Sequence, residues 1–264
     1  MQELTQLLVQ GEESAPLDVA ALQLARIECP GLEVEPYLEL LDSHANELAE
    51  KTEGIDNGED FVAALSDYFF EELGFEGNRE NYYDPANSCL NEVLLRRKGI
   101  PITLSVVCIE VARRLEFPLY GVALPGHFIL RYDDGEYCAF LDAFHRGRLL
   151  SDEDCFELAS HASGVAVRPD ESLLDPADNR QIVIRMLNNL RSAYIRNEQP
   201  EKLLQVLDLL IQSNPRSPEN YRQRGLIRAR LQMIHPARQD FRRYLELAPD
   251  SPESAEVSRW LRCL

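Results

Sequence analysis

Apolar residues recur every three or four positions through most of the first 115 residues of the chain, which is the spacing of one helix face. Asp18 precedes the first of these runs as a candidate N-cap, and Pro30-Gly31 ends it. Asp56-Asn57-Gly58 breaks the chain further on, and Gly99 closes a later run. We therefore predict a helix-rich N-terminal part, with helices over 19–27, 38–48, 61–73, 89–98 and 102–115.

A different pattern follows the last of these helices. The segments 120–124, 128–132 and 137–141 are short and apolar, as strands are. Asp133-Asp134-Gly135 lies between the second and third segments and is a typical hairpin turn sequence. We therefore predict a small antiparallel sheet, followed by a helix near 152–161 and a polar linker from about 168 to 179.

The C-terminal third of the chain contains a repeat of 34 residues, the length of a tetratricopeptide unit. Asn214-Pro215 and Ala248-Pro249 are one period apart, and each proline ends a predicted apolar helix, over 203–211 and 237–247. A last predicted helix, 254–264, would cap the stack. Plain helical hairpins are the alternative interpretation. The second unit has Tyr221, Gly225, Ala237, Phe241 and Pro249 at the expected positions, whereas the first keeps Tyr194 and Pro215.

These patterns together predict an α+β fold with many helices and one small antiparallel sheet. A chain of 264 residues is long enough for about two domains. We place a first domain with its N-terminal helices at 1–167, a linker at 168–180 and helical repeats at 181–264.

The net charge of −18 opposes nucleic-acid binding, and its distribution along the chain is uneven. Residues 1–180 carry a net charge of −23, whereas residues 181–264 carry +5. Two units with different surfaces would explain this asymmetry. Docking of the two units on each other is the simpler alternative.

The six cysteines are scattered and form no CxxC pair, which argues against a zinc knuckle, a redox motif or a disulfide framework. The histidines have no metal-ligand spacing along the sequence, so we predict neither a metal nor a cofactor. No apolar run reaches the roughly 20 residues that span a bilayer, and the first residues lack a basic start and an apolar signal core. We therefore expect a cytoplasmic protein that does not bind membranes.

His127 and Asp142 are the strongest candidates for chemistry. His127 begins the second predicted strand and Asp142 ends the third, so the two side chains should lie within hydrogen-bond distance on neighbouring strands. Such a pair can orient an imidazole so that it activates a thiol. It can also be a fixed structural pair or part of a binding site.

Four strings of the chain resemble the SirB-type family of bacterial transglutaminase-like proteins, which carry tetratricopeptide repeats at the C-terminus. The resemblance implies a papain-like domain in which a Cys opens the central helix and is activated by the helix N-terminus and a His. It maps the His and the Asp of that pattern onto His127 and Asp142. The matching strings are 87–94, 96–105, 124–128 and 141–144.

The position that the resemblance assigns to the thiol, roughly 101–103, reads Pro101-Ile102-Thr103 and holds no Cys. A Thr hydroxyl is a much weaker nucleophile than a thiol near neutral pH. Cys89 is the alternative nucleophile, because the start of a helix lowers the pKa of a thiol; a buried packing role is the simpler interpretation. Asn91, Glu92 and Thr103 are candidates to line the same pocket.

Basic and amide side chains also recur on the first helix of each predicted repeat. Such groups can bind the carboxylate of a peptide, so we expect them to share one concave surface and to bind a protein or peptide partner. Contact with the acidic N-terminal part is the alternative. These residues are Arg185, Asn188, Arg196, Arg222 and Arg230.

We therefore interpret the chain as a protein-interaction or regulatory protein with a catalytically degenerate transglutaminase-like core. The alternative is a cysteine-dependent hydrolase or acyltransferase that acts on protein or peptide amides, with Cys89, His127 and Asp142 as its triad.

Overall fold

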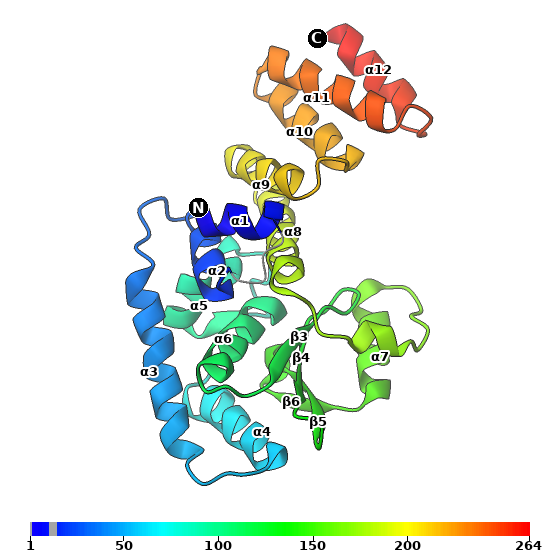
Figure 1. Cartoon of the computed structure of the whole chain (residues 1–264). Helices are drawn as coiled ribbons and strands as arrows, with labels where there is room; N and C mark the ends of the chain where they lie inside the picture. Colours follow the sequence, from blue (N-terminus) through cyan, green and yellow to red (C-terminus); the bar gives the residue numbers. More distant parts are fainter. Residues whose placement is uncertain (1, 11–14) are drawn as a thin grey trace.

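The computed structural model describes residues 2–10 and 15–264, and most of them are helical (Figure 1). All five helices predicted for the N-terminal part are present, and the α+β class is confirmed. No helix of the described residues is long and apolar enough to cross a bilayer. The helical elements up to residue 114 are α1 (Gln2–Gln10), α2 (Leu17–Ala25), α3 (Glu35–Lys51), α4 (Gly58–Ser66), the π-helix η1 (Asp67–Glu72), the 3₁₀ helix η2 (Pro85–Ser88), α5 (Leu90–Arg96) and α6 (Pro101–Arg114).

Local sequence signals set the ends of these helices. Asn57 caps α4, because its side-chain oxygen accepts a hydrogen bond from the backbone N–H of Asp60 at 2.9 Å. Helix α6 begins with Pro101 at its first position. A proline is tolerated there because the backbone N–H of the first helical residue has no intrahelical acceptor. Arg97 ends α5 in the left-handed conformation, with φ of 57°.

The main sheet is antiparallel and has the strand order β3-β4-β5-β6. Leu130 lies opposite Leu141, and Gly135 has φ of 88° in the predicted turn between β4 and β5. A separate parallel pair joins β1 to β2. The sheet region consists of β1 (Glu76–Gly77), β2 (Lys98–Gly99), β3 (Leu119–Val122), β4 (Ile129–Asp133), β5 (Cys138–Asp142), the 3₁₀ helix η3 (Ala143–His145), β6 (Arg148–Leu150) and helix α7 (Asp152–Ser163).

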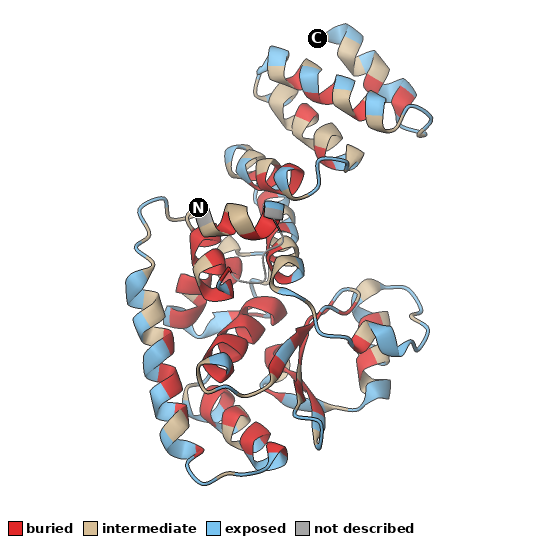
Figure 2. Cartoon of the chain, viewed as in Figure 1, coloured by how far each residue is buried: buried red, intermediate tan, exposed pale blue. Residues whose placement is uncertain are grey.

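Helix α6 is the centre of the core. Every residue from Pro101 to Ala112 is buried (Figure 2). The helix packs against α3 and α5 on one side and against β3 and β4 on the other. A helix that is enclosed in this way needs apolar residues around most of its circumference, which its sequence provides.

The C-terminal helices form the predicted stack of hairpins. Gly225 of α10 is required for their close approach, because a Cβ at this position would lie 2.6 Å from the ring of Phe241 in α11. Helices α10, α11 and α12 extend away from the rest of the molecule (Figure 1). The repeat region consists of α8 (Asn179–Arg196), α9 (Pro200–Ser213), α10 (Pro218–Arg230), α11 (Ile234–Leu247) and α12 (Ser254–Cys263).

The predicted linker is held against the sheet and is not a free connection. It contains the 3₁₀ helix η4 (Glu171–Leu174), and the backbone N–H of Ala177 donates to the carbonyl of Gly121 in β3 at 2.7 Å. Most buried side chains of α8 and α9 belong to the same apolar core as those of α1 to α6. As a domain border, 168–180 stays a prediction.

Candidate functional site

The turn before β4 fixes the position of His127. Gly126 has φ of +74°, and a Cβ there would lie 2.5 Å from the carbonyl carbon of Ala162 in α7. On the other side, the carbonyl of His127 accepts a hydrogen bond from Nη2 of Arg185 in α8, at 2.9 Å. Helices α7 and α8 therefore hold the backbone that carries this imidazole, whose side chain is 8% exposed.

Asp142 ends β5 and is almost completely buried. Its Oδ1 accepts hydrogen bonds from the backbone N–H groups of Phe144 and His145, at 3.0 and 3.3 Å, and so caps η3. Its Oδ2 lies 3.1 Å from Nε2 of His127, so the structure brings these two residues together as the strand positions predicted. Burial raises the pKa of the Asp142 carboxyl, but the hydrogen bonds from His127 and His145 outweigh burial and hold the pKa below its ordinary value.

His145 is a third member of this group, and the sequence pattern did not predict it. Its Nδ1 lies 2.6 Å from Oδ2 of Asp142, and its ring stacks on that of His127 with 6.1 Å between ring centroids. Three atoms that can ligate a metal thus lie within 4.8 Å of one another. The Asp-x-x-His spacing across a short turn is the signal that could have indicated this residue.

The start of α6 offers no thiol to this imidazole. Thr103 is buried, and its hydroxyl donates to the carbonyl of Asn87 at 2.6 Å and accepts from the N–H of Ile100 at 3.2 Å. These contacts hold the start of the helix in place. Thr103 therefore has a structural role in the described chain, and it does not line the pocket that we predicted.

Cys89 forms no hydrogen bond with His127 among the described residues. It is buried at the N-cap of α5, and its Sγ donates to the carbonyl of Pro85 at 3.4 Å. Among the described residues, no cysteine sulfur forms a hydrogen bond with the ring of His127. Burial raises the pKa of the Cys89 thiol, and nearby acidic groups, Glu28 foremost, raise it further. This shift is opposite to that of an activated thiol.

Asn91 and Glu92 interact with each other in α5. Nδ2 of Asn91 donates to Oε1 of Glu92 at 3.2 Å, while the buried Oδ1 of Asn91 has no hydrogen-bond partner among the described residues. No hydrogen bond or ion pair joins either side chain to His127 or Asp142 in the described chain. Their predicted place in a pocket with these residues is therefore not supported.

The side chains predicted to bind a peptide do not share one surface. Arg185 donates to the His127 carbonyl, as described above, and is half-buried. The guanidinium of Arg196 lies 3.8 Å from the centre of the Tyr83 ring. Both arginines thus contact the N-terminal part, as the alternative interpretation expected, but neither forms an ion pair in the described chain.

The remaining predicted residues also lie apart from one another. Arg222 forms an ion pair with Glu219 in its own helix, at 2.7 Å. Arg230 lines a hollow between α8, α9 and α10. Only Asn188 of the five lines the groove described next.

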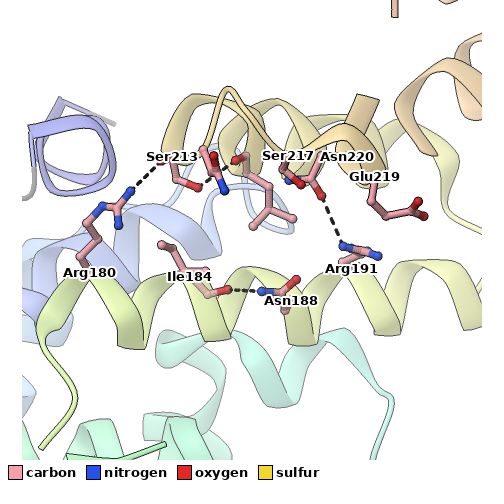
Figure 3. A pocket seen from close by; sticks show the side chains of 10 residues that line it. Arg180, Ile184, Asn188, Arg191, Ser213, Ser217, Glu219 and Asn220 are labelled. Carbon is pink, nitrogen blue, oxygen red and sulfur yellow. Dashed lines mark hydrogen bonds between the residues drawn. The ribbon is translucent and has the colours of Figure 1, made fainter. Parts of the chain in front are cut away.

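A groove of about 500 Å³ lies between α8 and the connection from α9 to α10 (Figure 3). Arg180 closes one end, where its guanidinium donates to the carbonyls of Leu8 and Ser213 at 3.0 and 2.6 Å. Nη1 of Arg191 lies 3.5 Å from Oδ1 of Asn220, at the limit of a hydrogen bond. The lining residues are Arg180, Ile184, Asn188, Arg191, Leu210, Ser213, Asn214, Ser217, Glu219 and Asn220.

Opposite charge explains little of the contact between the two parts. In the described chain, one ion pair crosses the predicted border, between Nζ of Lys202 and Oε2 of Glu28 at 2.7 Å. Other arginines of the repeats pair within them: Arg224 and Arg228 share Asp240 at 2.7 and 2.8 Å. The apolar core that includes α8 and α9 is the larger contribution.

Two family models match the chain in the predicted order. The model of the transglutaminase-like superfamily matches residues 35–188, and a tetratricopeptide repeat model matches residues 190–262. A UPF0162 protein of Xylella fastidiosa strain Temecula1 is 39% identical over 245 residues, which are 91% of this chain and 86% of the relative. Protein SirB1 of Salmonella typhimurium is 33% identical over 241 residues, which are 90% and 88% of the two chains.

Among solved structures, a crystal structure of menin that reveals the binding site for Mixed Lineage Leukemia protein aligns with 98% of this chain and 71% of its own. The sequence identity is 11% and the TM-score is 0.40, which is too low to carry an argument about fold or function.

Proposed function

Because the chain belongs to the SirB1 and UPF0162 family, with a transglutaminase-like domain followed by tetratricopeptide repeats, we propose that it is a regulatory protein-interaction protein without thiol chemistry. Repeats of this type serve protein–protein interaction in general. The observation that carries the proposal is the groove of Figure 3, where Arg191 forms one long hydrogen bond and, among the described residues, no ion pair.

The groove suits a segment with a carboxylate. Arg191 forms no ion pair in the described chain, and its one side-chain contact is the long bond to Asn220. Nδ2 of Asn188 donates to the carbonyl of Ile184 in its own helix, so this side chain is held on the groove wall (Figure 3). A guanidinium without an ion-pair partner can bind a carboxylate through charge-assisted hydrogen bonds, which are stronger than neutral ones.

The acidic residue of the groove does not oppose such a ligand. Among the described lining residues, Glu219 is the one carboxylate, and its two oxygens accept hydrogen bonds from Arg222 at 2.7 and 2.8 Å. Arg222 therefore contributes indirectly, because it offsets the charge of Glu219. The proposed ligand is a peptide segment with an acidic side chain or a free C-terminal carboxylate, bound by Asn188, Arg191 and Asn220.

A peptide selection tests this proposal. Wild-type protein is used to select from a library of eight-residue peptides with free C-termini. The same library with amidated C-termini shows whether the protein binds the C-terminal carboxylate or an acidic side chain. We expect Arg191→Glu to weaken binding of a selected peptide at least about tenfold, as for loss of one charge-assisted bond, and binding to weaken with salt.

Arg259→Glu is the matched control, because Arg259 is an exposed residue of α12 outside the groove and the change in net charge is the same. Binding of this variant should stay within about twofold of wild type, since exposed charges away from the ligand contribute little. Equal loss in the two variants, or the absence of any selected peptide, would contradict the proposed ligand.

Thiol labelling tests the absence of thiol chemistry. With iodoacetamide near neutral pH, we expect the exposed Cys138 and Cys263 to react first. The buried Cys89, Cys108 and Cys155 should react slowly, since burial raises the pKa of each thiol, that of Cys155 to about 12. Fast and selective labelling of Cys89 that is lost in His127→Ala would restore the hydrolase or acyltransferase alternative.

A further inference from the structure

We propose that His127, Asp142 and His145 form a binding site for a divalent transition-metal ion of the zinc type. This site is independent of the peptide groove, and neither proposal requires the other. Two imidazole nitrogens and one carboxylate oxygen are a donor set that such ions prefer, and three protein ligands leave a fourth position for water or another ligand.

The three donor atoms are already close to the spacing that a metal requires. Oδ2 of Asp142 lies 3.1 Å from Nε2 of His127 and 2.6 Å from Nδ1 of His145. Around a tetrahedral zinc ion with bonds of about 2.0–2.2 Å, neighbouring ligand atoms are about 3.4 Å apart. The two ring nitrogens lie within 4.8 Å of each other, so an ion needs shifts on the order of 1 Å. The side chain of His145, which is 36% exposed, can make them.

Contacts around the cluster hold these ligands in place. Oδ1 of Asp142 is occupied by two backbone N–H groups, which leaves Oδ2 as the oxygen directed at both rings. Gly147 after the η3 turn has φ of +71°, and its N–H donates to the carbonyl of Asp142 at 2.9 Å. Nδ1 of His127 and Nε2 of His145 accept no hydrogen bond from described residues, so each can carry the proton that its ligating nitrogen gives up.

An ion can reach the site from a small pocket. Asp142 and His145 line a hollow of about 190 Å³ beside α7, and the carboxylates of Asp154 and Glu157 line its other walls. Arg148, which also lines this pocket, is paired with Asp154 at 3.0 Å. Glu157 has no ion-pair partner among the described residues, so an acidic charge remains to attract a cation. The open coordination position should face this pocket, because two of the three ligands line it.

Metal binding by the full-length chain tests the inference. The exposed Cys138 and Cys263 are first changed to Ser, because thiols bind zinc on their own. We expect this protein to bind one Zn²⁺ per chain in competition with a chromophoric chelator. Co²⁺ should give the visible absorption of a four-coordinate site without a thiolate charge-transfer band.

His145→Ala is the informative variant, because this side chain is partly exposed and its loss should leave the fold intact. Removal of one ligand should weaken Zn²⁺ binding at least about tenfold. Even the loss of a residue that only hydrogen-bonds to a metal ligand typically weakens metal binding by about that factor. Asp142→Asn should weaken it as well, with the fold checked by circular dichroism. His235→Ala, an exposed histidine of α11, is the control and should bind as the parent does. Absence of a one-to-one Zn²⁺ complex, or equal binding by His145→Ala and His235→Ala, would overturn the inference.

Discussion

At the scale of single residues, Gly126 occupies the most restrictive position near His127. Its backbone is left-handed, and the backbone of α7 fills the space where a Cβ would lie. Only glycine satisfies both conditions without displacement of the helix. The position of the imidazole therefore depends on a residue without a side chain.

The variant Gly126→Ala should lose stability for both reasons. A left-handed alanine costs about 1–2 kcal/mol, and a contact with backbone adds about 1–3 kcal/mol because the backbone must move. Gly164→Ala is the matched control, since Gly164 has φ of +71° and open space around its Cβ position. Chemical denaturation should show a larger loss for Gly126→Ala. Equal losses of stability in the two variants would show that α7 moves to accommodate the added methyl group without a further free-energy cost.

The individual residues of the site also show how much of it could be predicted from the sequence. His127 and Asp142 could be identified, because a hairpin of regular strands brings its ends together. His145 was missed, since its ring reaches Asp142 through the short η3 turn and the Asp-x-x-His spacing was its one local signal. Arg185 is 58 residues from His127 along the chain, and its contact depends on how α8 docks. Side chains placed by local periodicity were predictable, and those placed by packing were not.

At the scale of elements, the C-terminal end of α6 contains a buried charge cluster. Glu110 is 1% exposed and contacts both Arg113 and Arg114, at 2.7 and 3.1 Å. Arg114 also contacts the buried Asp18 of α2 and Asp42 of α3, so three carboxylates share this guanidinium. Burial and the charge of Asp18 therefore outweigh the arginines and raise the pKa of Glu110 to about 7.

This shift predicts that stability falls as pH rises. The folded state keeps a proton on Glu110 up to pH about 7, whereas the unfolded chain releases it near 4.5, so the folded state binds more protons in this window. From pH 4.5 to 7 the contribution of Glu110 to the free energy of unfolding falls by at most about 3 kcal/mol. Glu110→Gln should remove this change, and Tm measured across the window should differ most from wild type near pH 7. A constant difference between wild type and variant would contradict the assignment.

Elements were predictable to the extent that their own sequence specifies them. The long helices and the turn between β4 and β5 follow from periodicity and glycine positions. Strand β6 was missed because its three residues are largely exposed and lack an alternating pattern. The segment 168–180 was predicted as a polar linker, and its β-bridge between Val122 and Pro176, which joins it to the sheet, was not predicted. Such tertiary contacts leave no periodic signal.

At the scale of the whole molecule, the core extends through α8 and α9. Ile182, Met186 and Leu190 of α8 and Leu203 and Leu207 of α9 are buried in the same cluster as α1 to α6. Helices α10 to α12 surround a separate, smaller cluster around Phe241. The boundary between apolar cores thus lies near residue 214, after the first pair of repeat helices.

Two truncations should behave differently for this reason. A chain of residues 1–213 should unfold cooperatively, whereas a chain of residues 1–180 should be unfolded or aggregated. Each buried aliphatic side chain contributes about 1.5–3 kcal/mol, and the whole stability of a domain is about 5–15 kcal/mol. Thermal unfolding followed by circular dichroism compares the two. A midpoint for 1–180 that equals that of 1–213 would show that α8 and α9 are dispensable.

The continuous core also determines at which positions recombination with other genes could exchange segments of the protein. Recombination within 214–217 would pass through an exposed loop and transfer α10 to α12 as a self-contained cassette. Recombination at the start of α8 would separate α8 and α9 from the rest of the apolar core on which they pack. Because stacked repeats contact only their neighbours, the array could grow or shrink at its far end over evolution. Its first helix pair should instead descend with the domain on which it packs.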